Sequence, residues 1–587
     1  MAIDDGNTVT TKLLTLLNVS ATKLGKRKVV EEDFVPAEKL NKRKSISFSD
    51  KVSIKRLDAE EHHVEEERAT ETDKADAEDD AMDVDEDADV RDSSDPYETH
   101  FGPNSSVLAE KVRTAVDQGA WTTSKEVLGR LGPATASVPV QPDPNAPASK
   151  TSGQIDILER LKGSFKAHQA KCTPTHAAKT NPDSPPEDVQ DQGFTRPSVL
   201  VLLPFRNSAL DWFHALTSHT PSPSFQIENQ ARFLAEYDLP PGTEDKLTSA
   251  EPGTYPLDHV ETFKGNVDDN FRIGVKLTRK SVRMFTEFYG CDLILASPLG
   301  LRRSIEKEKS ADYLTSIEIL IVDQMDALMM QNWDHVKFVM SHLNKLPKES
   351  HDTDFSRIKP WYLDGLAPYL RQSILLSSFE TPEMRSLYNN SLKNVAGKVK
   401  IDKRWLPVDI PDGVKPSFVH FDCGSPQDEA DKRFHHFTTQ LLPSVLKSAV
   451  QSTNTVVFVP SSYDFIRVHN YFRKTAGVSF TVLSEYSSNQ DISRARLAFF
   501  KGEKSFLLVS ERFHFYKRYK LRGIRNLVFY GPPDHPQYFT EYLSYPFLDE
   551  EVEPSDVTCR VLYSKYDWFR LERVAGTEAA AELVKIV

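Results

Sequence analysis

The chain has 587 residues, of which 39% are hydrophobic and 27% charged, and its formal net charge is −13. This length predicts more than one domain, and the apolar content is high enough to fill their cores. The four cysteines stand far apart with no C-x-x-C pair, which argues against a zinc site or a disulfide framework. No run of eighteen apolar residues is present, so we expect no membrane association.

The negative charge is concentrated near the N-terminus. Residues 58–95 contain 19 Asp/Glu and 3 Lys/Arg, a local charge of −16, so that subtracting this from −13 leaves +3 for the rest of the chain. Because such a segment has too little apolar surface to offset its ordering entropy, residues 1–95 are predicted to be disordered. The basic clusters at 26–28 and 42–44 are typical of a bipartite nuclear-import signal, although a solvated basic tail explains them equally well.

Residues 96–190 are predicted to be a partly ordered linker with short helices. Apolar residues recur at helical spacing at Ile155, Leu158, Leu161 and Phe165. Loops rich in Pro, Ser and Asn lie on both sides of this pattern, and they favour one or two helices separated by irregular chain.

From about residue 191 the pattern changes to short buried strands that alternate with helices. The first half contains S-V-L-V-L-L-P, D-L-I-L-A-S-P, I-E-I-L-I-V-D and S-I-L-L-S-S-F, and the second T-V-V-F-V-P, S-F-L-L-V-S and N-L-V-F-Y-G-P. Continuous apolar runs of this length are typical of parallel strands that are covered on both faces. We therefore predict an α/β fold with two successive domains, 191–405 and 406–587, and a surface insertion at about 236–268.

The residues that follow each strand indicate the chemistry, because ligands of open parallel sheets bind at the carboxyl ends of the strands. In chain order these positions read P-F-R-N-S-A-L, A-S-P-L-G-L-R, V-D-Q-M-D, S-S-F, V-F-V-P-S-S-Y-D, L-L-V-S-E-R and L-R-G-I-R-N-L-V-F-Y-G-P-P. This order resembles the DEAD-box RNA helicases. The resemblance implies two RecA-like domains with parallel sheets, preceded by the disordered acidic tail.

Three departures from the helicase pattern predict that the ATPase is absent. The chain has no G-K-[ST] phosphate loop, and Asp323-Gln324-Met325-Asp326 replaces the D-E-A-D sequence, with an amide where the catalytic Glu would stand. Residues 538–545 contain no arginine where helicases have an arginine finger, a group worth about 10³–10⁵ in rate. We expect no catalytic residue, no metal and no cofactor.

The RNA-facing side of the helicase fold is retained. By resemblance to the helicases, the sugar–phosphate backbone would be contacted by Arg206, Ser297, Arg302, Arg522 and Gly523. The three arginines are predicted to follow strand ends and to share one groove across both domains, although packing or protein contacts would explain these residues as well. The segment F-H-F-Y-K-R-Y-K-L-R at 513–522 suits single-stranded RNA, but its aromatic residues would equally suit a domain core.

Longer strings of the sequence resemble one family. They are P-F-R-N-S-A-L, D-L-I-L-A-S-P-L-G-L-R, I-E-I-L-I-V-D-Q-M-D-A-L-M-M-Q-N-W and S-E-R-F-H-F-Y-K-R-Y-K-L-R-G-I-R. These strings are similar to the U3 small nucleolar RNA-associated protein 25 family, also called the digestive organ expansion factor family, over about 191–575. The resemblance implies a nucleolar, non-enzymatic component of the small-subunit processome. Its partners would be the U3 small nucleolar RNA particle, pre-ribosomal RNA and other processome proteins, and it would support early processing toward small-subunit ribosomal RNA. Two alternatives stay open: an active helicase with a nonstandard nucleotide pocket, and a protein–protein adaptor that does not touch RNA.

Overall fold

The computed structural model describes residues 108, 110–140, 192–219, 226–240, 242–278, 280–351, 353–448, 450–550 and 552–585. The described residues belong to one compact unit. The predicted acidic tail and the expected helix around Leu158 lie outside the described residues.

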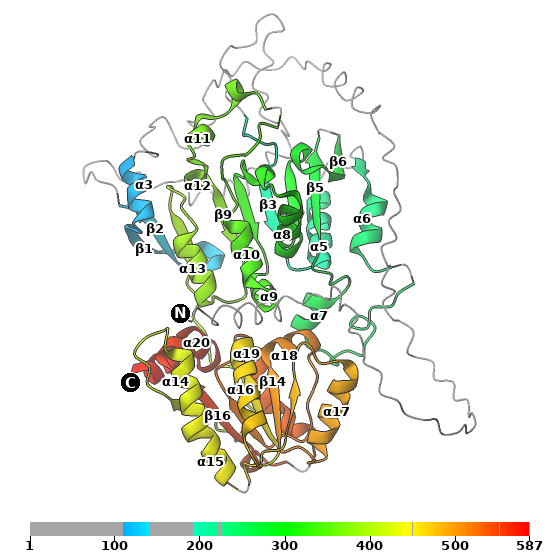
Figure 1. The fold of residues 1–587 in the computed structure, drawn as a ribbon, viewed down its shortest axis with the longest axis vertical. Helices are drawn as coiled ribbons and strands as arrows, with labels where there is room; N and C mark the ends of the chain where they lie inside the picture. Colours follow the sequence, from blue (N-terminus) through cyan, green and yellow to red (C-terminus); the bar gives the residue numbers. More distant parts are fainter. Residues whose placement is uncertain are drawn as a thin grey trace, which may run out of the picture. The chain divides into compact units, whose positions relative to one another are not determined.

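The first domain is built on a seven-stranded sheet, drawn in cyan to green in Figure 1, with the order β4-β6-β5-β7-β3-β8-β9. Its strands are β3 (Val199–Leu202), β4 (Gln226–Glu228), β5 (Arg272–Leu277), β6 (Ser281–Thr286), β7 (Leu293–Ala296), β8 (Ile319–Val322) and β9 (Gln372–Leu375). Strands β7, β3, β8 and β9 run parallel as predicted, whereas β5 is antiparallel to both of its neighbours. The strands that carry the sequence motifs therefore end at one edge of the sheet.

Both faces of the first sheet are covered, as its continuous apolar strands require. Successive side chains of a strand point to opposite faces, so Leu200 and Leu202 enter one apolar core while Val201 and Leu203 enter another. The helices are α5 (Arg206–Ser218), α6 (Gln230–Tyr237), α7 (Leu257–Phe263), α8 (Pro298–Glu308), α9 (Met325–Gln331), α10 (Trp333–Met340), α11 (Pro360–Leu363), α12 (Ala367–Leu370) and α13 (Pro382–Asn390).

The second domain, drawn in yellow to red in Figure 1, has a six-stranded sheet in the order β11-β16-β15-β12-β14-β13, and every pair of neighbours is parallel. Its strands are β11 (Ser417–His420), β12 (Thr455–Val459), β13 (Phe480–Leu483), β14 (Phe506–Ser510), β15 (Asn526–Phe529) and β16 (Thr558–Tyr563). Its helices are α14 (Glu429–His436), α15 (Leu442–Lys447), α16 (Ser462–Lys474), α17 (Asn489–Phe500), α18 (Glu511–Lys517), α19 (Pro536–Ser544), α20 (Trp568–Ala575) and α21 (Thr577–Lys585).

A small third sheet joins the region before residue 191 to the end of the first domain. Helix α3 (Glu110–Asp117) is followed by the hairpin β1 (Trp121–Val127) and β2 (Pro133–Pro139), and β2 pairs with β10 (Lys398–Ile401). Val112 and Val116 of α3 pack against Val395. The sequence predicted helices and irregular chain here, so the hairpin is a correction. Strand β2 gains its second neighbour from β10, about 260 positions away in the chain, and local periodicity carries no signal for such distant pairing.

The described residues contain no helix long and apolar enough to cross a membrane. Cys291, Cys423 and Cys559 are buried free thiols. These three cysteines therefore act as small core residues.

Candidate functional site

The strand-end motifs of the first domain meet at one edge of the sheet. Strand β3 lies between β7 and β8, so the loops that follow these strands are neighbours. The indole N–H of Trp212 on α5 donates to Asp323 Oδ2 over 3.0 Å, and the Ser208 hydroxyl donates to Gln324 Oε1 over 3.2 Å. The loop after β3 is thus hydrogen-bonded directly to the segment in place of the D-E-A-D sequence.

The Asp323-Gln324-Met325-Asp326 segment leads from β8 into α9. Gln324 has a left-handed backbone with φ of 52°, and its N–H donates to Asp323 Oδ1 over 2.8 Å. Met325 is buried in the apolar core, and its N–H donates to the carbonyl of Leu376 beyond β9. Asp323, Gln324 and Asp326 line a cavity. The segment therefore presents two carboxylates and one amide to that cavity and uses Met325 as an anchor.

The cavity has a volume of about 650 Å³ and is lined by residues of both domains. Its charged lining consists of four carboxylates and two cations: Asp258, Glu261, Asp323, Asp326, Lys403 and Arg518. Burial, together with the nearby charge of Arg518, lowers the pKa of His259 to about 4, so this lining histidine is neutral at pH 7. The cavity is therefore acidic at neutral pH, and it favours cations over anions.

Helix α19 covers most of the residues where a helicase would carry its arginine finger, and it contributes a glutamate instead. Arg518 donates to Glu541 from Nε over 2.8 Å and from Nη2 over 2.6 Å. His514 Nε2 lies 2.8 Å from the same carboxylate, and because its Nδ1 has no partner the Nε2–H donates. Burial alone would raise the pKa of Glu541, but the hydrogen bonds from His514 and Arg518 outweigh it and hold that pKa at about 2.

Arg518 also reaches the first domain. Its Nη2 lies 2.8 Å from Asp258 Oδ2 on α7, and Gln537 donates to the same oxygen over 3.1 Å. Arg518 itself is 4% exposed, and the carboxylates of Asp258 and Glu541 raise its pKa against the effect of burial. An ion cluster centred on the buried Arg518 therefore joins the two domains at the wall of the cavity.

A second buried arginine joins the domains on the other side of the S-S-F motif. Arg573 of α20 is 2% exposed, and its Nη1 donates to the carbonyl of Glu380 over 2.7 Å. Its guanidinium lies 4.4 Å from the ring centroid of Phe379, the last residue of that motif, and its Nη2 lies 3.2 Å from Asp534. Burial lowers the pKa of Arg573 to about 10, so it is charged at pH 7. No sequence motif pointed to Arg573, because its partners Glu380 and Asp534 lie far from it in the chain.

Apolar contacts also cross between the domains. Phe205 at the end of the β3 loop and Met330 of α9 belong to the same apolar core as Phe515 of the second domain. Phe263 of α7 packs between them, with ring centroids 5.6 Å from Phe205 and 5.1 Å from Phe515. Helix α7 lies in the segment predicted to be a surface insertion, yet His259 is only 5% exposed. The helix is therefore part of the interdomain core.

Two of the predicted RNA ligands are held by the protein itself. Ser297 is fully buried, where its hydroxyl accepts the N–H of Gly300 over 2.9 Å as the N-cap of α8 and donates to the carbonyl of Asp269 over 2.6 Å. Arg206 pairs with Asp268 over 2.9 Å, and its side chain is 23% exposed. Ser297 is therefore a structural cap, and the charge of Arg206 is compensated within the first domain.

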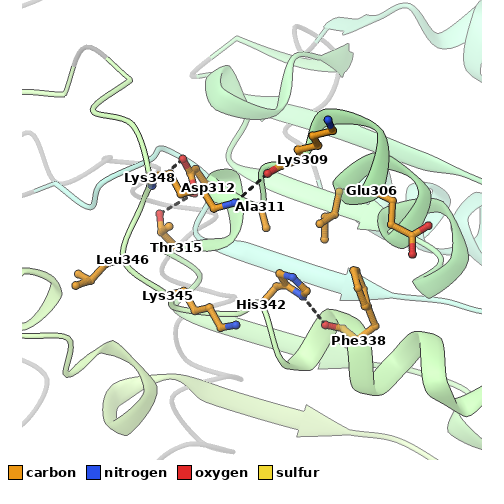
Figure 2. Close-up of a pocket in the computed structure, with 11 residues that line it drawn as sticks. Glu306, Lys309, Ala311, Asp312, Thr315, Phe338, His342, Lys345, Leu346 and Lys348 are labelled. Carbon is orange, nitrogen blue, oxygen red and sulfur yellow. Dashed lines mark hydrogen bonds between the residues drawn. The ribbon is translucent and has the colours of Figure 1, made fainter. Parts of the chain in front are cut away.

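Arg302 lies on α8 beside a second cavity, of about 290 Å³, which Figure 2 shows in close-up. It pairs with Glu306 over 2.8 Å and lies 4.9 Å from the ring centroid of Phe338, and both of these partners line the cavity. The basic residues of the lining are Lys309, Lys345, Lys348 and His342. In Figure 2 the Lys348 ammonium donates to the carbonyl of Lys309. Arg302 is thus partnered on its own helix.

The prediction that Arg522 follows a strand end is wrong. Arg522 and Gly523 precede β15, which begins at Asn526, and the carbonyl of Gly523 accepts from Asn454, the residue before β12. The chain leaves the carboxyl end of β14, forms α18 and returns to the amino ends of the strands before β15 begins. The contacts to the first domain come from the other edge, where Arg512 donates to the carbonyl of Gln331 over 2.9 Å. The three predicted arginines therefore do not share one groove.

Most of the aromatic residues of the 513–522 segment serve the core. Phe513, His514 and Phe515 are buried, and Tyr516 packs against the same core while its hydroxyl donates to the carbonyl of Met330 over 3.3 Å. The packing interpretation of this part of the segment is confirmed. Among the described residues, no group of three or more His, Cys, Asp and Glu is placed to hold a metal ion.

Two successive α/β domains, each built on a sheet of mainly parallel strands with sequence motifs at the strand ends, define the class of protein by fold. The DEAD-box splicing factor Prp28 from yeast is one similar solved structure, 12% identical with a TM-score of 0.22, covering 63% of this chain and 64% of that one. The fold class rests on the strand order and not on that low overlap.

Sequence comparison gives the family. The model described as UTP25, NTP hydrolase-like domain matches residues 159–399, and Utp25, C-terminal domain matches 408–586. U3 small nucleolar RNA-associated protein 25 from Sclerotinia sclerotiorum is 36% identical over 564 residues, covering 84% of this chain and 76% of that protein. The homolog from Xenopus tropicalis is 42% identical over 410 residues, covering 68% of this chain and 52% of that one. The chain belongs to the U3 small nucleolar RNA-associated protein 25 family.

Proposed function

We propose that this protein is a non-enzymatic ribosome biogenesis factor of the small-subunit processome. It associates with the U3 small nucleolar RNA particle in the nucleolus and supports early processing of pre-ribosomal RNA together with other processome proteins. The names of its relatives, at 36% identity over 84% of the chain, support the association. The basic clusters at 26–28 and 42–44 support delivery to the nucleus.

The domain limits are part of the same proposal. We place the RecA-like domains at 191–405 and 406–587, which the family matches at 159–399 and 408–586 support.

The acidic cavity between the domains is the observation that supports the absence of nucleotide hydrolysis. A nucleotide triphosphate needs a cradle of backbone N–H groups at a helix N-terminus and a lysine on the phosphates. The cavity offers four carboxylates against two cations, and Arg518 is already paired with Glu541 and Asp258. Bringing a polyanion to that lining would cost Coulomb energy instead of releasing it. An amide at Gln324 also gives no general base for the attacking water.

The interdomain contacts support a scaffold role. Enzymes of this kind close and reopen their domains in each cycle. Here the buried Arg573 is bonded to Glu380, Arg518 is paired with Asp258, and Phe263 lies in a shared apolar core. Opening the domains would expose apolar surface and leave buried charges without partners. Such contacts favour one fixed arrangement, which suits a protein that holds other components in place.

Complementation of depleted cells tests the proposal. Cells that lack the protein should accumulate unprocessed pre-ribosomal RNA, and both the wild type and Asp323→Asn should restore processing and copurify U3 RNA equally. Asp334→Asn, at an exposed carboxylate of α10, is the matched control. Failure of Asp323→Asn alone, at normal protein level and melting temperature, would show that the nucleotide-site carboxylate is needed and would overturn the non-enzymatic assignment. A wild-type protein that does not copurify U3 RNA would overturn the association.

A further inference from the structure

The second domain carries a basic and aromatic surface at the amino-terminal edge of its sheet, the edge opposite to the Arg512 contact with the first domain. Helix α17 ends there at Phe500, and the chain passes beside it before β15 begins. Residues 491–525 contain ten Lys/Arg and three Asp/Glu, in a chain whose net charge is −13. We call the basic rim the six residues Arg496, Phe500, Lys501, Tyr519, Lys520 and Arg522.

The basic rim is held together by two arginine–aromatic pairs. The guanidinium of Arg496 lies 5.0 Å from the ring centroid of Tyr519, and it donates to the carbonyl of Lys520 over 3.1 Å. The guanidinium of Arg522 lies 5.3 Å from the ring centroid of Phe500. Arg496 and Phe500 are four residues apart on α17, so they share one helix face. The two pairs are therefore neighbours on a single surface.

A glycine makes the close approach of the two segments possible. Gly523 has a φ of 81°, and a Cβ at this position would come within 3.2 Å of the Cα of Phe500. Its N–H donates to Asp549 Oδ2 over 3.0 Å, which fixes the turn that carries Arg522. The backbone turn at Gly523 therefore fixes the position of Arg522 beside Phe500.

The rim is open to solvent and carries excess positive charge. Phe500 is 47% exposed, although an aromatic ring of this size is normally buried in a core. Asp549 pairs with Arg522 and Arg525 over 2.9 and 3.8 Å, whereas Lys501 and Lys520 are exposed and pair with no carboxylate in the part of the chain that the structure describes. Their ammonium groups are available to an anionic partner.

We propose that the basic rim binds single-stranded RNA, a role that rests on the proposed function. Unpaired bases stack on aromatic rings and on guanidinium planes, and lysines beside them neutralise the phosphates. The rim supplies both kinds of group: two guanidinium planes close to aromatic rings, the half-exposed ring of Phe500, and the exposed Lys501 and Lys520. RNA contact is therefore assigned to the amino edge of the second sheet, where Lys501 and Lys520 add uncompensated charge, and not to Arg206 and Arg302, which Asp268 and Glu306 compensate.

The test is fluorescence anisotropy of the full chain with labelled oligouridine of about 20 nucleotides, titrated at several salt concentrations. Lys501→Glu with Lys520→Glu should weaken binding roughly tenfold at about 0.15 M salt and reduce the salt slope by about 1.4, because two phosphate contacts are lost. Phe500→Ala should also weaken binding roughly tenfold but leave the slope unchanged, because stacking releases no counterions. Lys415→Glu with Lys432→Glu, at exposed lysines of the same domain, is the control and should bind like the wild type.

Thermal melts of all variants establish that each is folded. Three results would overturn the proposal. They are rim variants that bind RNA as tightly as the wild type, a control variant that loses as much affinity as the rim variants, and a wild type that binds no RNA at low salt. A labelled peptide of residues 58–95 is the second probe: rim variants that lose the peptide while keeping RNA would assign the rim to an acidic protein segment instead.

Oligouridine binding tests the rim, whereas copurification of U3 RNA tests the proposed function, so the two can fail independently. A rim variant that no longer binds oligouridine but still copurifies U3 RNA from extracts supports the rim and shows that protein contacts also hold the particle. Unchanged oligouridine binding together with normal U3 copurification overturns the rim alone.

Discussion

Glu541→Gln is the substitution that most sharply probes the ion cluster between the domains. The carboxylate of Glu541 accepts hydrogen bonds from Arg518 at 2.6 and 2.8 Å and from His514 at 2.8 Å. Glutamine keeps the shape of the side chain but removes its charge. Among the described residues, Arg518 would then keep Asp258 as its one carboxylate partner, in a place where Arg518 is 4% exposed.

The size of the effect follows from the pKa of Glu541. The folded protein lowers this pKa from 4.5 to about 2, and each unit corresponds to about 1.4 kcal/mol, so the ionised form contributes about 3 kcal/mol to the free energy of unfolding. Because the folded pKa is depressed, this contribution is present above pH 4.5 and is lost as the pH falls toward 2. By pH 3 it should be less than half of its neutral value.

Urea unfolding of the full chain at pH 7 and pH 3 measures the effect. The variant should be less stable than the wild type by about 3 kcal/mol at pH 7, and the difference should shrink to less than half at pH 3. Glu582→Gln, at an exposed position of α21, should change stability by less than about 0.5 kcal/mol. A difference for Glu541→Gln that is no larger than this control, or that is the same at both pH values, would refute the reasoning.

Two further predictions concern packing and motion. Gly300→Ala should destabilise the first domain by roughly 2 kcal/mol or more in urea unfolding, because a Cβ would lie 2.1 Å from the carbonyl oxygen of Phe271. Gly290→Ala is the control and should be nearly neutral, because its Cβ would meet no atom closer than 3.6 Å. Equal stability of the two glycine variants would contradict the packing argument. The second prediction places one dye in each domain, on Lys337→Cys and on Lys432→Cys. Energy transfer between the dyes should not change when Mg-ATP and RNA are added. A change in energy transfer would show that the domains move.

The sequence predicted the strands that are buried on both faces. Runs such as V-L-V-L at 199–202 and V-V-F-V at 456–459 are apolar at every position, and the structure places alternate residues in separate cores. The position of Asp323 at a strand end also followed from that pattern. These features are local, since period and composition within a few residues determine them.

Features that depend on distant residues were missed or wrong. The β1–β2 hairpin gains its third strand from β10, and Arg573 is placed by Asp534 and Glu380. The error at Arg522 has a different origin: the predicted strand N-L-V-F-Y-G-P begins after Arg522, and in a parallel sheet this order places Arg522 at the amino end of the strand. The helical spacing of His259 and Phe263 was a usable signal for a buried face on α7, but one helical turn rarely decides burial.

The most direct test of the central claim is phosphate release by the purified full chain with Mg-ATP and RNA. The acidic cavity, the amide at Gln324 and the absent phosphate loop predict a rate equal to that of a mock preparation, with no increase on adding RNA. Asp323→Ala should give the same trace. RNA-stimulated release above the mock, abolished by Asp323→Ala, would contradict the account and establish an active nucleotide site between the domains.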